Sequence, residues 1–366
     1  MINGWATADG TARYRDRFKD AADGHFRQAR NLWLSSIGLG SYLGQPDEAT
    51  DRRYMEAVLR AVGLGVNLID TAANYRFQRS ERSIGAALTE LQSHGFARDE
   101  LLICTKGGYL PFDGTPPPDV RRYVEETFIG PGIASWADIA GGAHCMTPSY
   151  LENQLEQSLR NLSLDCLDVY YVHNPESQLA AVSQAVFWQR LSAAFEFLEQ
   201  SAAKGKIQNY GVATWKGFRV DPNAREYHSL ERMVQVARDH AGDSHHFRFI
   251  QLPVNLAMPE AVFVPNQRVG DEWLTPVEAA QRLGVAVVAS ASILQGQLAR
   301  GLPEAIRRSL GSLASDAQTG IQFVRSAPGL TAALVGMSQV AHVEEDLELV
   351  RIEPSASEAV MSLFEE

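Results

Sequence analysis

The stretch VNLIDTAANYRFQRSERSIGAALTELQSHGFARDELLICTK (66–106) predicts two buried strands joined by a helix. Its two ends, 66–71 and 100–106, are short apolar runs of the length expected for buried strands. Between them, 80–93 is expected to form a helix. A strand, a helix and a second strand in this order are typical of a parallel βαβ unit.

The same alternation continues along the whole chain of 366 residues. Eight such units predict an α/β fold of the (β/α)8 TIM barrel type, with a long loop after strand three and the active site at the C-terminal ends of the strands. A doubly wound sheet is the competing fold, but no GxGxxG fingerprint stands between the first strand and the first helix. Each expected strand precedes an expected helix, and the strands cover 33–42, 66–71, 100–106, 165–173, 207–214, 247–255, 285–292 and 330–337.

The chain is expected to form one barrel domain over 33–366, preceded by an N-terminal extension over 1–32. A stretch rich in Gly and Pro, 107–148, interrupts the rhythm of strands and helices. A connection of this length inside a compact domain is usually a working lid or a disordered excursion. Because it also contains several aromatic residues, we expect a lid-like insertion.

Composition excludes several classes of protein. The formal net charge of −11 disfavours a nucleic-acid or membrane partner, because such a surface repels phosphate backbones and anionic lipids. Three scattered cysteines suit a reducing compartment and predict neither a disulfide framework nor a metal site. The chain starts without the apolar core of a secretory signal and has no apolar run of about 20 residues, so a cytoplasmic location is expected.

Four chemically active residues stand at, or just past, the ends of three successive expected strands: Asp70, Tyr75, Lys106 and His173. A tyrosine is normally too weak an acid to donate a proton quickly at neutral pH. A neighbouring Lys106 would favour the phenolate and lower the pKa of Tyr75, and Asp70 could hold that lysine charged. Such a group could protonate a carbonyl oxygen, while His173 donates a hydrogen bond to it.

Each of the four residues also has a purely structural interpretation. A lysine and an aspartate at strand ends often form an ion pair, a tyrosine near a turn often packs, and His173 could cap its strand. All four at the ends of three successive strands is a much less common coincidence. The chain offers no activated serine or cysteine, so a bound hydride donor would have to complete the reaction.

Several segments between residues 33 and 350 resemble successive signatures of the aldo-keto reductase superfamily. They are GVNLIDTAANY (65–75), SERSIGAAL (80–88), TKGG (105–108), LDVYYVHNP (167–175), GKIQNYGVAT (205–214), QLPVNL (251–256) and VEEDL (343–347). The resemblance implies a barrel that binds NAD(P)H extended across the strand C-termini. It implies that Tyr75 is the acid, that Lys106 and Asp70 tune it, and that His173 orients the carbonyl.

The resemblance also implies which residues hold the cofactor. Two positions depart from the family pattern. Ala213-Thr214 replaces the usual Ser-Asn, so only Thr214 still offers a hydroxyl, and Ser290 stands where many members have a Tyr that stacks on the nicotinamide. The expected cofactor contacts up to the loop after strand seven are Gly40, Ser41, Tyr42, Asp70, Ala213, Thr214, Gln251, Ser290, Ala291, Ile293, Gln295, Gly296 and Leu298.

The adenosine-phosphate segment is expected at 336–346. Members that favour NADPH usually have a Lys or Arg there, and this segment has neither. The resemblance implies NADPH as the cofactor. NADH is an alternative, because an anion that leaves water needs cationic or several N–H partners and no fixed cation stands here. The expected contacts are Gly336, Ser338, Gln339, His342, Glu345 and Asp346.

The substrate is expected to be a small-molecule carbonyl compound with a bulky or aromatic body, because aromatic residues could form an apolar pocket. These are Tyr42, Tyr109, Trp136 and Trp215. The resemblance predicts an NAD(P)H-dependent reductase of an aldehyde, a ketone or an imine. The alternative is a cofactor-binding regulatory subunit with little turnover, similar to the β subunits of potassium channels.

Overall fold

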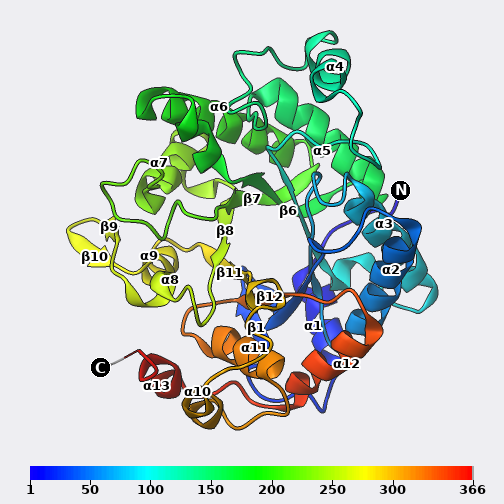
Figure 1. The fold of residues 1–366 in the computed structure, drawn as a ribbon, viewed down its shortest axis with the longest axis vertical. Coiled ribbons are helices and arrows are strands. Elements are labelled where there is room, and N and C mark those ends of the chain that lie inside the picture. The colour runs from blue at the N-terminus through cyan, green and yellow to red at the C-terminus, as the bar shows by residue number, and fades with distance from the viewer. Residues whose placement is uncertain (365–366) are drawn as a thin grey trace.

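The computed structural model describes residues 1–364 and shows a closed barrel of parallel strands (Figure 1). Strands that are neighbours along the chain pair with one another, and the last strand pairs with the first. The expected (β/α)8 TIM barrel is therefore confirmed. In chain order the barrel strands are β3 (Ile37–Gly40), β4 (Leu68–Asp70), β5 (Leu102–Gly107), β6 (Leu167–His173), β7 (Ile207–Ala213), β8 (Phe247–Pro253), β11 (Ala286–Ser290) and β12 (Ala332–Gly336).

A helix follows each barrel strand and packs on the outside of the barrel (Figure 1). In the third of these outer helices, α5 (Pro148–Leu162), apolar residues recur at helical spacing and are buried: Leu151, Leu155, Leu159 and Leu162. Such an apolar stripe holds an amphipathic helix against the sheet. The outer helices are α2 (Glu48–Gly63), α3 (Arg79–Ser93), α5 (Pro148–Leu162), α6 (Gln184–Ala203), α7 (Leu230–Ala241), α9 (Pro276–Arg282), α11 (Asp316–Ser326) and α12 (Val340–Asp346).

The interior of the barrel is filled by a separate cluster of apolar side chains. Leu68, Leu102, Val169 and Phe249 belong to it and are fully buried. At Gly38 there is no room for a side chain, because a Cβ would lie 2.8 Å from the methyl groups of Leu68 and Leu334. The barrel is therefore a packed core, and a ligand reaches the strands only at their ends.

The first expected strand, 33–42, is wrong in its extent. The barrel strand covers only Ile37–Gly40, while Leu32–Ser35 forms β2 and pairs antiparallel with β1 (Phe26–Ala29) outside the barrel. Arg30 and Asn31 make the turn between these two strands, with φ of 50° and 67°. Ser35 and Ser36 stand at the junction but are both buried, so periodicity alone does not show where the chain leaves the hairpin and enters the barrel.

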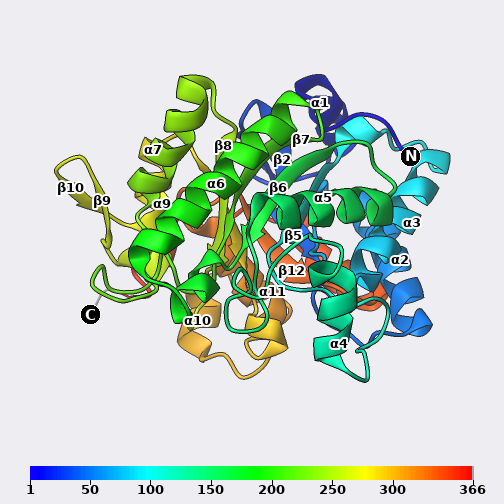
Figure 2. The ribbon, with the colours of Figure 1, turned by 90° about the horizontal axis from the view of Figure 1, so that it is seen from above.

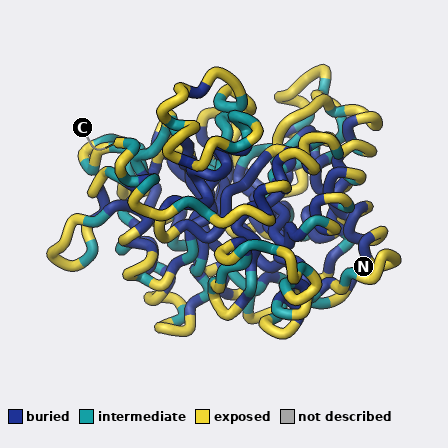
Figure 3. The backbone as a smooth tube through the Cα atoms, turned by 90° about the horizontal axis from the view of Figure 1, so that it is seen from below, coloured by how far each residue is buried: buried dark blue, intermediate teal, exposed yellow. Residues whose placement is uncertain are grey.

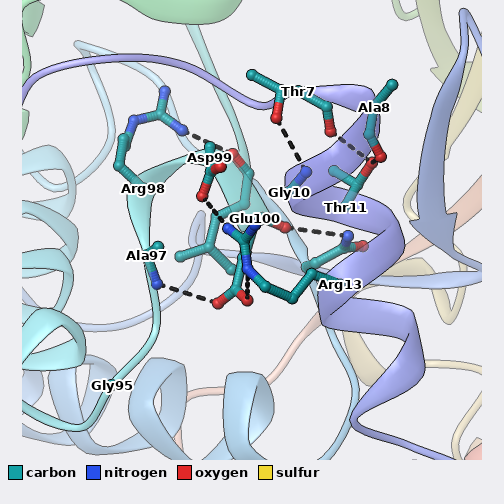
Figure 4. A network of polar contacts seen from close by, with 12 residues as sticks. Thr7, Ala8, Gly10, Thr11, Arg13, Gly95, Ala97, Arg98, Asp99 and Glu100 are labelled. Carbon is teal, nitrogen blue, oxygen red and sulfur yellow. Dashed lines mark hydrogen bonds and ion pairs between the residues drawn. The ribbon is translucent and has the colours of Figure 1, made fainter.

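The N-terminal helix α1 (Ala8–Asp16) lies at the end of the barrel opposite to α4 and α10 (Figure 2). It is attached to the short 3-10 turn η1 (Arg98–Glu100), where the Arg13 side chain donates to Asp99 and Glu100 (Figure 4). A Cβ at Gly10 would overlap the main-chain oxygen of Asp99, so glycine permits this close approach. Residues before the barrel thus cover its N-terminal face.

The insertion at 107–148 is folded in this structure. It contains α4 (Val120–Val124) and a π-helical turn, η2 (Glu125–Ile129), and Phe128 is buried against the ring of Tyr150. Its two arms meet at a bridge between Tyr109 and His144. The insertion rises from the same end of the barrel as the C-terminal ends of the strands (Figure 2).

Buried backbone lies in the centre of the molecule, and exposed backbone forms the outer turns and loops (Figure 3). None of the helices within residues 1–364 combines the length and the apolar character that a membrane crossing needs. The remaining elements are η3 (Pro175–Ala180), η4 (Gly242–Ser244), α8 (Glu260–Phe263), β9 (Gln267–Val269), β10 (Glu272–Leu274), η5 (Leu294–Gly296), α10 (Glu304–Ser309), η6 (Leu347–Arg351) and α13 (Ser357–Met361).

Candidate active site

The barrel brings together the four side chains that the sequence placed at strand ends. Asp70 ends β4, Lys106 lies near the end of β5 and His173 ends β6. Tyr75 follows β4 in a loop whose main chain is tied to β5, because the amide of Ala73 donates to the carbonyl of Lys106 at 3.1 Å, the length of an ordinary hydrogen bond. Parallel pairing of adjacent strands thus places all four groups at one end of the barrel.

Lys106 and Asp70 form a buried ion pair between Nζ and Oδ1. Nζ of Lys106 also donates to the carbonyl of Thr71 at 2.8 Å, and Nε2 of Gln251 donates to the second oxygen of Asp70 at 2.9 Å. Burial lowers the pKa of Lys106, but the adjacent Asp70 carboxylate, together with Tyr75, offsets this and holds the pKa above its usual value. Lys106 is therefore a fixed positive charge beneath the site.

Tyr75 lies with the centre of its ring 5.1 Å from Nζ of Lys106. Burial raises the pKa of Tyr75, and the charge of Lys106 lowers it by less, so the net direction is upward. This is opposite to the shift expected from the lysine alone, because that expectation did not include the loss of water around the phenol. The hydroxyl of Tyr75 is consequently protonated and available as a donor.

His173 faces Tyr75 across the site, with the two ring centres 5.8 Å apart and nearly perpendicular. Burial, followed by the positive charge of Lys106, lowers the pKa of His173 well below its ordinary value. The imidazole is therefore neutral at pH 7. Its Nδ1 is buried and has no hydrogen-bond partner within residues 1–364.

One cavity of about 870 Å³ begins at these residues and continues across the C-terminal ends of the strands. Asp70, Tyr75 and His173 line it, whereas Lys106 lies behind them. Most residues expected to bind the cofactor also line it. They are Gly40, Ser41, Tyr42, Ala213, Thr214, Gln251, Ser290, Ala291, Ile293, Gln295, Gly296, Gly336, Ser338, His342, Glu345 and Asp346.

Of the expected cofactor residues, Leu298 and Gln339 do not line this cavity within the described chain. Of the expected substrate residues, Tyr42, Tyr109 and Trp215 line it. Trp136 does not, and its Nε1 instead donates to Glu125 at 2.8 Å on the exposed side of the insertion. The aromatic wall of the cavity is thus formed by three of the four expected residues.

Thr214 does not offer its hydroxyl to the cavity. Oγ1 of Thr214 donates to Glu176 at 2.8 Å and accepts from the amide of Gly217 at 2.7 Å. The same Glu176 oxygen accepts from the amides of Trp215 and Lys216 at 2.7 and 3.0 Å. Burial raises the pKa of Glu176, but its hydrogen bonds and the neighbouring imidazole lower it to about 2. A charged carboxylate therefore holds the 214–216 turn beside the cavity.

Arg300 lines the cavity and was not found by the sequence reasoning. It is the only lysine or arginine among the lining residues of the described chain, and it shares the cavity with Ser338 and His342. The resemblance points to 336–346 as the place of a basic residue, whereas Arg300 follows the loop after β11. The missed signal was a single arginine after the QGQLA run (295–299).

The residues present fit an extended dinucleotide with a nicotinamide at one end and phosphates at the other. At one end the Gln251 amide donates to Asp70, and elsewhere in the lining Arg300 is a cation of the kind that suits phosphate. A volume of about 870 Å³ is within the range of cofactor sites. Within residues 1–364 no three His, Cys, Asp or Glu side chains come together as a metal site would require.

Comparison with known proteins gives relatives that include aldo-keto reductases and a "Putative voltage-gated potassium channel subunit beta" of Schizosaccharomyces pombe. "Aldo-keto reductase AMT2" of Alternaria alternata is 31% identical over 163 residues, which are 40% of this chain and 41% of that protein. "Methylglyoxal reductase YeaE" of Escherichia coli is 29% identical over 49% of this chain and 45% of its own length. In these alignments the chain spans less than half the length of the curated relatives that it matches.

The fold is shared over a longer range. The structure of an aldo/keto reductase from Klebsiella pneumoniae in complex with NADP and acetate superposes with a TM-score of 0.61 and 20% identity, covering 93% of this chain and 94% of that one. The family model "Aldo/keto reductase family" matches residues 36–363. That range contains all eight barrel strands and the four residues at their ends. The chain therefore belongs to the aldo/keto reductase family.

Proposed function

We propose that this protein catalyses the NAD(P)H-dependent reduction of an aldehyde or a ketone, or of the related C=N group of an imine. The observation that carries the proposal is the arrangement of Tyr75 above the buried Lys106–Asp70 pair, with His173 opposite, on the wall of a large cavity. Family membership supports the same reaction.

The chain's own residues have distinct roles in this proposal. A bound reduced nicotinamide supplies a hydride to the carbonyl carbon. Tyr75 donates its hydroxyl proton to the carbonyl oxygen, and the charge of Lys106 stabilises the phenolate that remains. Asp70 keeps Lys106 charged and in place. Neutral His173 donates a hydrogen bond that orients the carbonyl oxygen, and general acid catalysis of this kind contributes about 10²–10⁴-fold.

NADPH is the proposed cofactor, with NADH as an alternative. The residues proposed to hold it are the expected cofactor residues that line the cavity, among them Gln251 and Ser338, together with Arg300. An arginine recognises phosphate well because its guanidinium forms charge-assisted and often bidentate hydrogen bonds. The NADP complex of the Klebsiella pneumoniae enzyme supports a phosphorylated cofactor here.

The proposed substrate has an uncharged, bulky or aromatic body. Tyr42, Tyr109 and Trp215 line the cavity, and Tyr42 packs edge-on against Tyr75 with ring centres 5.0 Å apart. Aromatic side chains provide large apolar contact area for such a body. The similarity to a methylglyoxal reductase supports including small aldehydes among the compounds to be tested.

A screen of carbonyl compounds tests this proposal by following the absorbance of NADPH and of NADH. The panel pairs methylglyoxal with aliphatic, aromatic and carboxylated aldehydes, and cofactor binding is measured separately by protein fluorescence. Turnover of uncharged aromatic aldehydes supports the proposal. Tight NADPH binding with no turnover of any compound contradicts it and favours the cofactor-binding regulatory role.

A further inference from the structure

His144 lies where the insertion returns to the barrel, far along the chain from His173 but beside it in space. The amide of Cys145 donates to the carbonyl of Gly108 at 2.8 Å, and the amide of Leu110 donates to that of Ala143 at 2.8 Å. These bonds hold the outgoing and returning arms together. The base of the insertion is therefore a fixed two-stranded connection.

The ring of His144 is buried and both of its nitrogens have partners. Nε2 lies 2.7 Å from the carbonyl oxygen of His173. Because a carbonyl only accepts, Nε2 carries the proton, and Nδ1 must then accept the hydrogen bond from Nε2 of Gln178 at 2.8 Å. Burial lowers the pKa of His144 to about 4, which keeps the ring in the neutral form that these two bonds require.

Gln178 is itself held in a single orientation. Its Nε2 also donates to the carbonyl of His144 at 2.9 Å, and its Oε1 accepts from Arg190 on α6 at 2.6 Å. Arg190 donates further to the carbonyls of Ala137 and Asp138 in the insertion. The tautomer of His144 is thus fixed by a chain of bonds that begins on an outer helix.

The main chain on the other side leaves no space for His144 to move. A Cβ at Gly108 would lie 2.7 Å from Nε2 of His144 and 3.0 Å from the carbonyl oxygen of His173, and the φ of Gly108 is +146°. Tyr109 packs edge-on against both histidine rings, with ring centres 5.2 Å from each. The hydroxyl of Tyr109 shares a hydrogen bond with Ser177 at 2.9 Å.

The orientation of the His173 ring depends on these surroundings. Its Nδ1 makes no hydrogen bond within residues 1–364, so no polar contact at that nitrogen fixes the ring. The ring is held by packing between Tyr75 and Tyr109 and by its own main chain, whose carbonyl is bound by His144. A change at His144 would consequently reach both the proposed carbonyl-orienting group and the aromatic wall.

We propose that His144 is a positioning residue for carbonyl reduction, which holds the main chain of His173 and the ring of Tyr109 in the geometry that the reaction needs. This inference rests on the proposed function. It assigns the insertion a part in orienting the substrate as well as covering it. His144 is not among the residues that line the cavity, whereas His173 and Tyr109 are, so its role is indirect and acts through these two residues.

The test compares His144→Phe with His144→Gln in the full-length protein. Phenylalanine keeps a flat ring but removes the donor, whereas the amide nitrogen of glutamine can take the place of Nε2. We expect H144F to lower kcat for an aromatic aldehyde by about 10–100-fold, since a misplacement of about 1 Å can cost about 10²-fold. The NADPH affinity of H144F should stay within about twofold of the wild-type value. H144Q should keep kcat within about threefold of wild type, because its amide nitrogen can still hold the geometry around His173.

Equal loss of kcat in both variants, or no loss in H144F, would contradict the positioning role of His144. As long as the wild-type protein reduces the aldehyde, either result leaves the proposed function intact. A wild-type protein that reduces no carbonyl compound overturns both together. Nitrogen-15 NMR of labelled histidines in the wild type gives a readout that needs no variant to fold. We expect His144 to be neutral and protonated at Nε2 from about pH 6 to about pH 8, because its pKa is lowered to about 4. A ring protonated at Nδ1 would overturn the inference.

Discussion

Nε2 of Gln251 donates a 2.9 Å hydrogen bond to Oδ2 of Asp70, which joins β8 to β4 across the C-terminal end of the barrel. The other oxygen of Asp70 contacts Lys106. One buried carboxylate thus connects the proposed acid machinery to a residue that lines the proposed cofactor cavity. Nζ of the same Lys106 lies 5.1 Å from the centre of the Tyr75 ring.

Replacement of Lys106 by methionine should destabilise the protein as well as inactivate it. The change leaves the carboxylate of Asp70 buried without a positive partner, and removing one member of a buried pair costs about 3–5 kcal/mol. Urea unfolding measures this loss. The double variant Lys106→Met with Asp70→Asn should recover most of the stability but no activity, and a double variant as unstable as the single one would contradict the explanation.

A second buried pair supports the barrel far from the cavity. Nη2 of Arg98 lies 2.6 Å from Oδ2 of Asp168, and this carboxylate also accepts from the amides of Ala6 and Ile103 at 2.6 and 2.7 Å. We expect Arg98→Met to lower the free energy of unfolding by about 3–5 kcal/mol, because Asp168 would remain buried and charged. Activity at temperatures where the variant is folded should change little.

The matched control for that experiment is Arg60→Met. Arg60 pairs with Glu344 at 2.8 Å, but the two side chains are 44% and 51% exposed. Exposed pairs contribute about 0–1 kcal/mol. Similar losses from the two substitutions would show that burial does not govern the effect.

Arg300 should contribute to the preference between cofactors. We expect Arg300→Ala to weaken NADPH binding by about tenfold and NADH binding by about twofold, because the 2′-phosphate adds charge that a guanidinium stabilises. Fluorescence titration with both cofactors measures this. Equal weakening of both would place Arg300 on the pyrophosphate instead. The wild-type preference for NADPH should remain below roughly 10³, or about 4 kcal/mol.

Asp346 predicts a pH dependence of stability. Burial, followed by the charge of Glu345, raises the pKa of Asp346 from its ordinary value of 3.8 to about 7. The pKa of Asp346 is higher in the folded than in the unfolded protein. Below the unfolded pKa the carboxyl is protonated in both states and costs no stability, and stability is lost as pH rises through about 7. Ionised Asp346 therefore destabilises the fold in alkaline solution.

Asp346→Asn removes this titration. We expect the variant to be more stable than wild type at pH 8.5 by about 1–4 kcal/mol, since each unit of pKa shift corresponds to about 1.4 kcal/mol. The difference should shrink by about pH 4, where the carboxyl is largely protonated in both folded and unfolded states. Urea unfolding without cofactor measures both values. A difference that grows toward acid pH would contradict the assigned direction.

The order of elements was predictable because each strand is a short apolar run and each outer helix carries an apolar stripe. The four strand-end residues followed from the same alternation, since parallel strands present their C-terminal ends together. The split between β2 and β3 was not predictable, because Ser35 and Ser36 at the junction are buried like the apolar residues around them. The left-handed turn at Arg30 and Asn31 reveals the hairpin.

The chemistry of individual side chains was less accessible from sequence. The hydroxyl of Thr214 is taken by Glu176, a residue 38 positions away, and the net pKa shift of Tyr75 depends on how much water the fold removes. Trp136 points to Glu125, outside the described cavity lining. Residue type indicates which contacts are available, whereas tertiary packing decides which are made.

The most direct measurement is the single-turnover rate of carbonyl reduction by Tyr75→Phe, with NADPH affinity measured on the same sample. The proposed role of Tyr75 predicts a fall of about 10²–10⁴-fold or more in rate, with affinity within about twofold of wild type, because only the proton donor is removed. A variant that reduces the same aldehyde within about tenfold of the wild-type rate would contradict the assignment of Tyr75 as the acid.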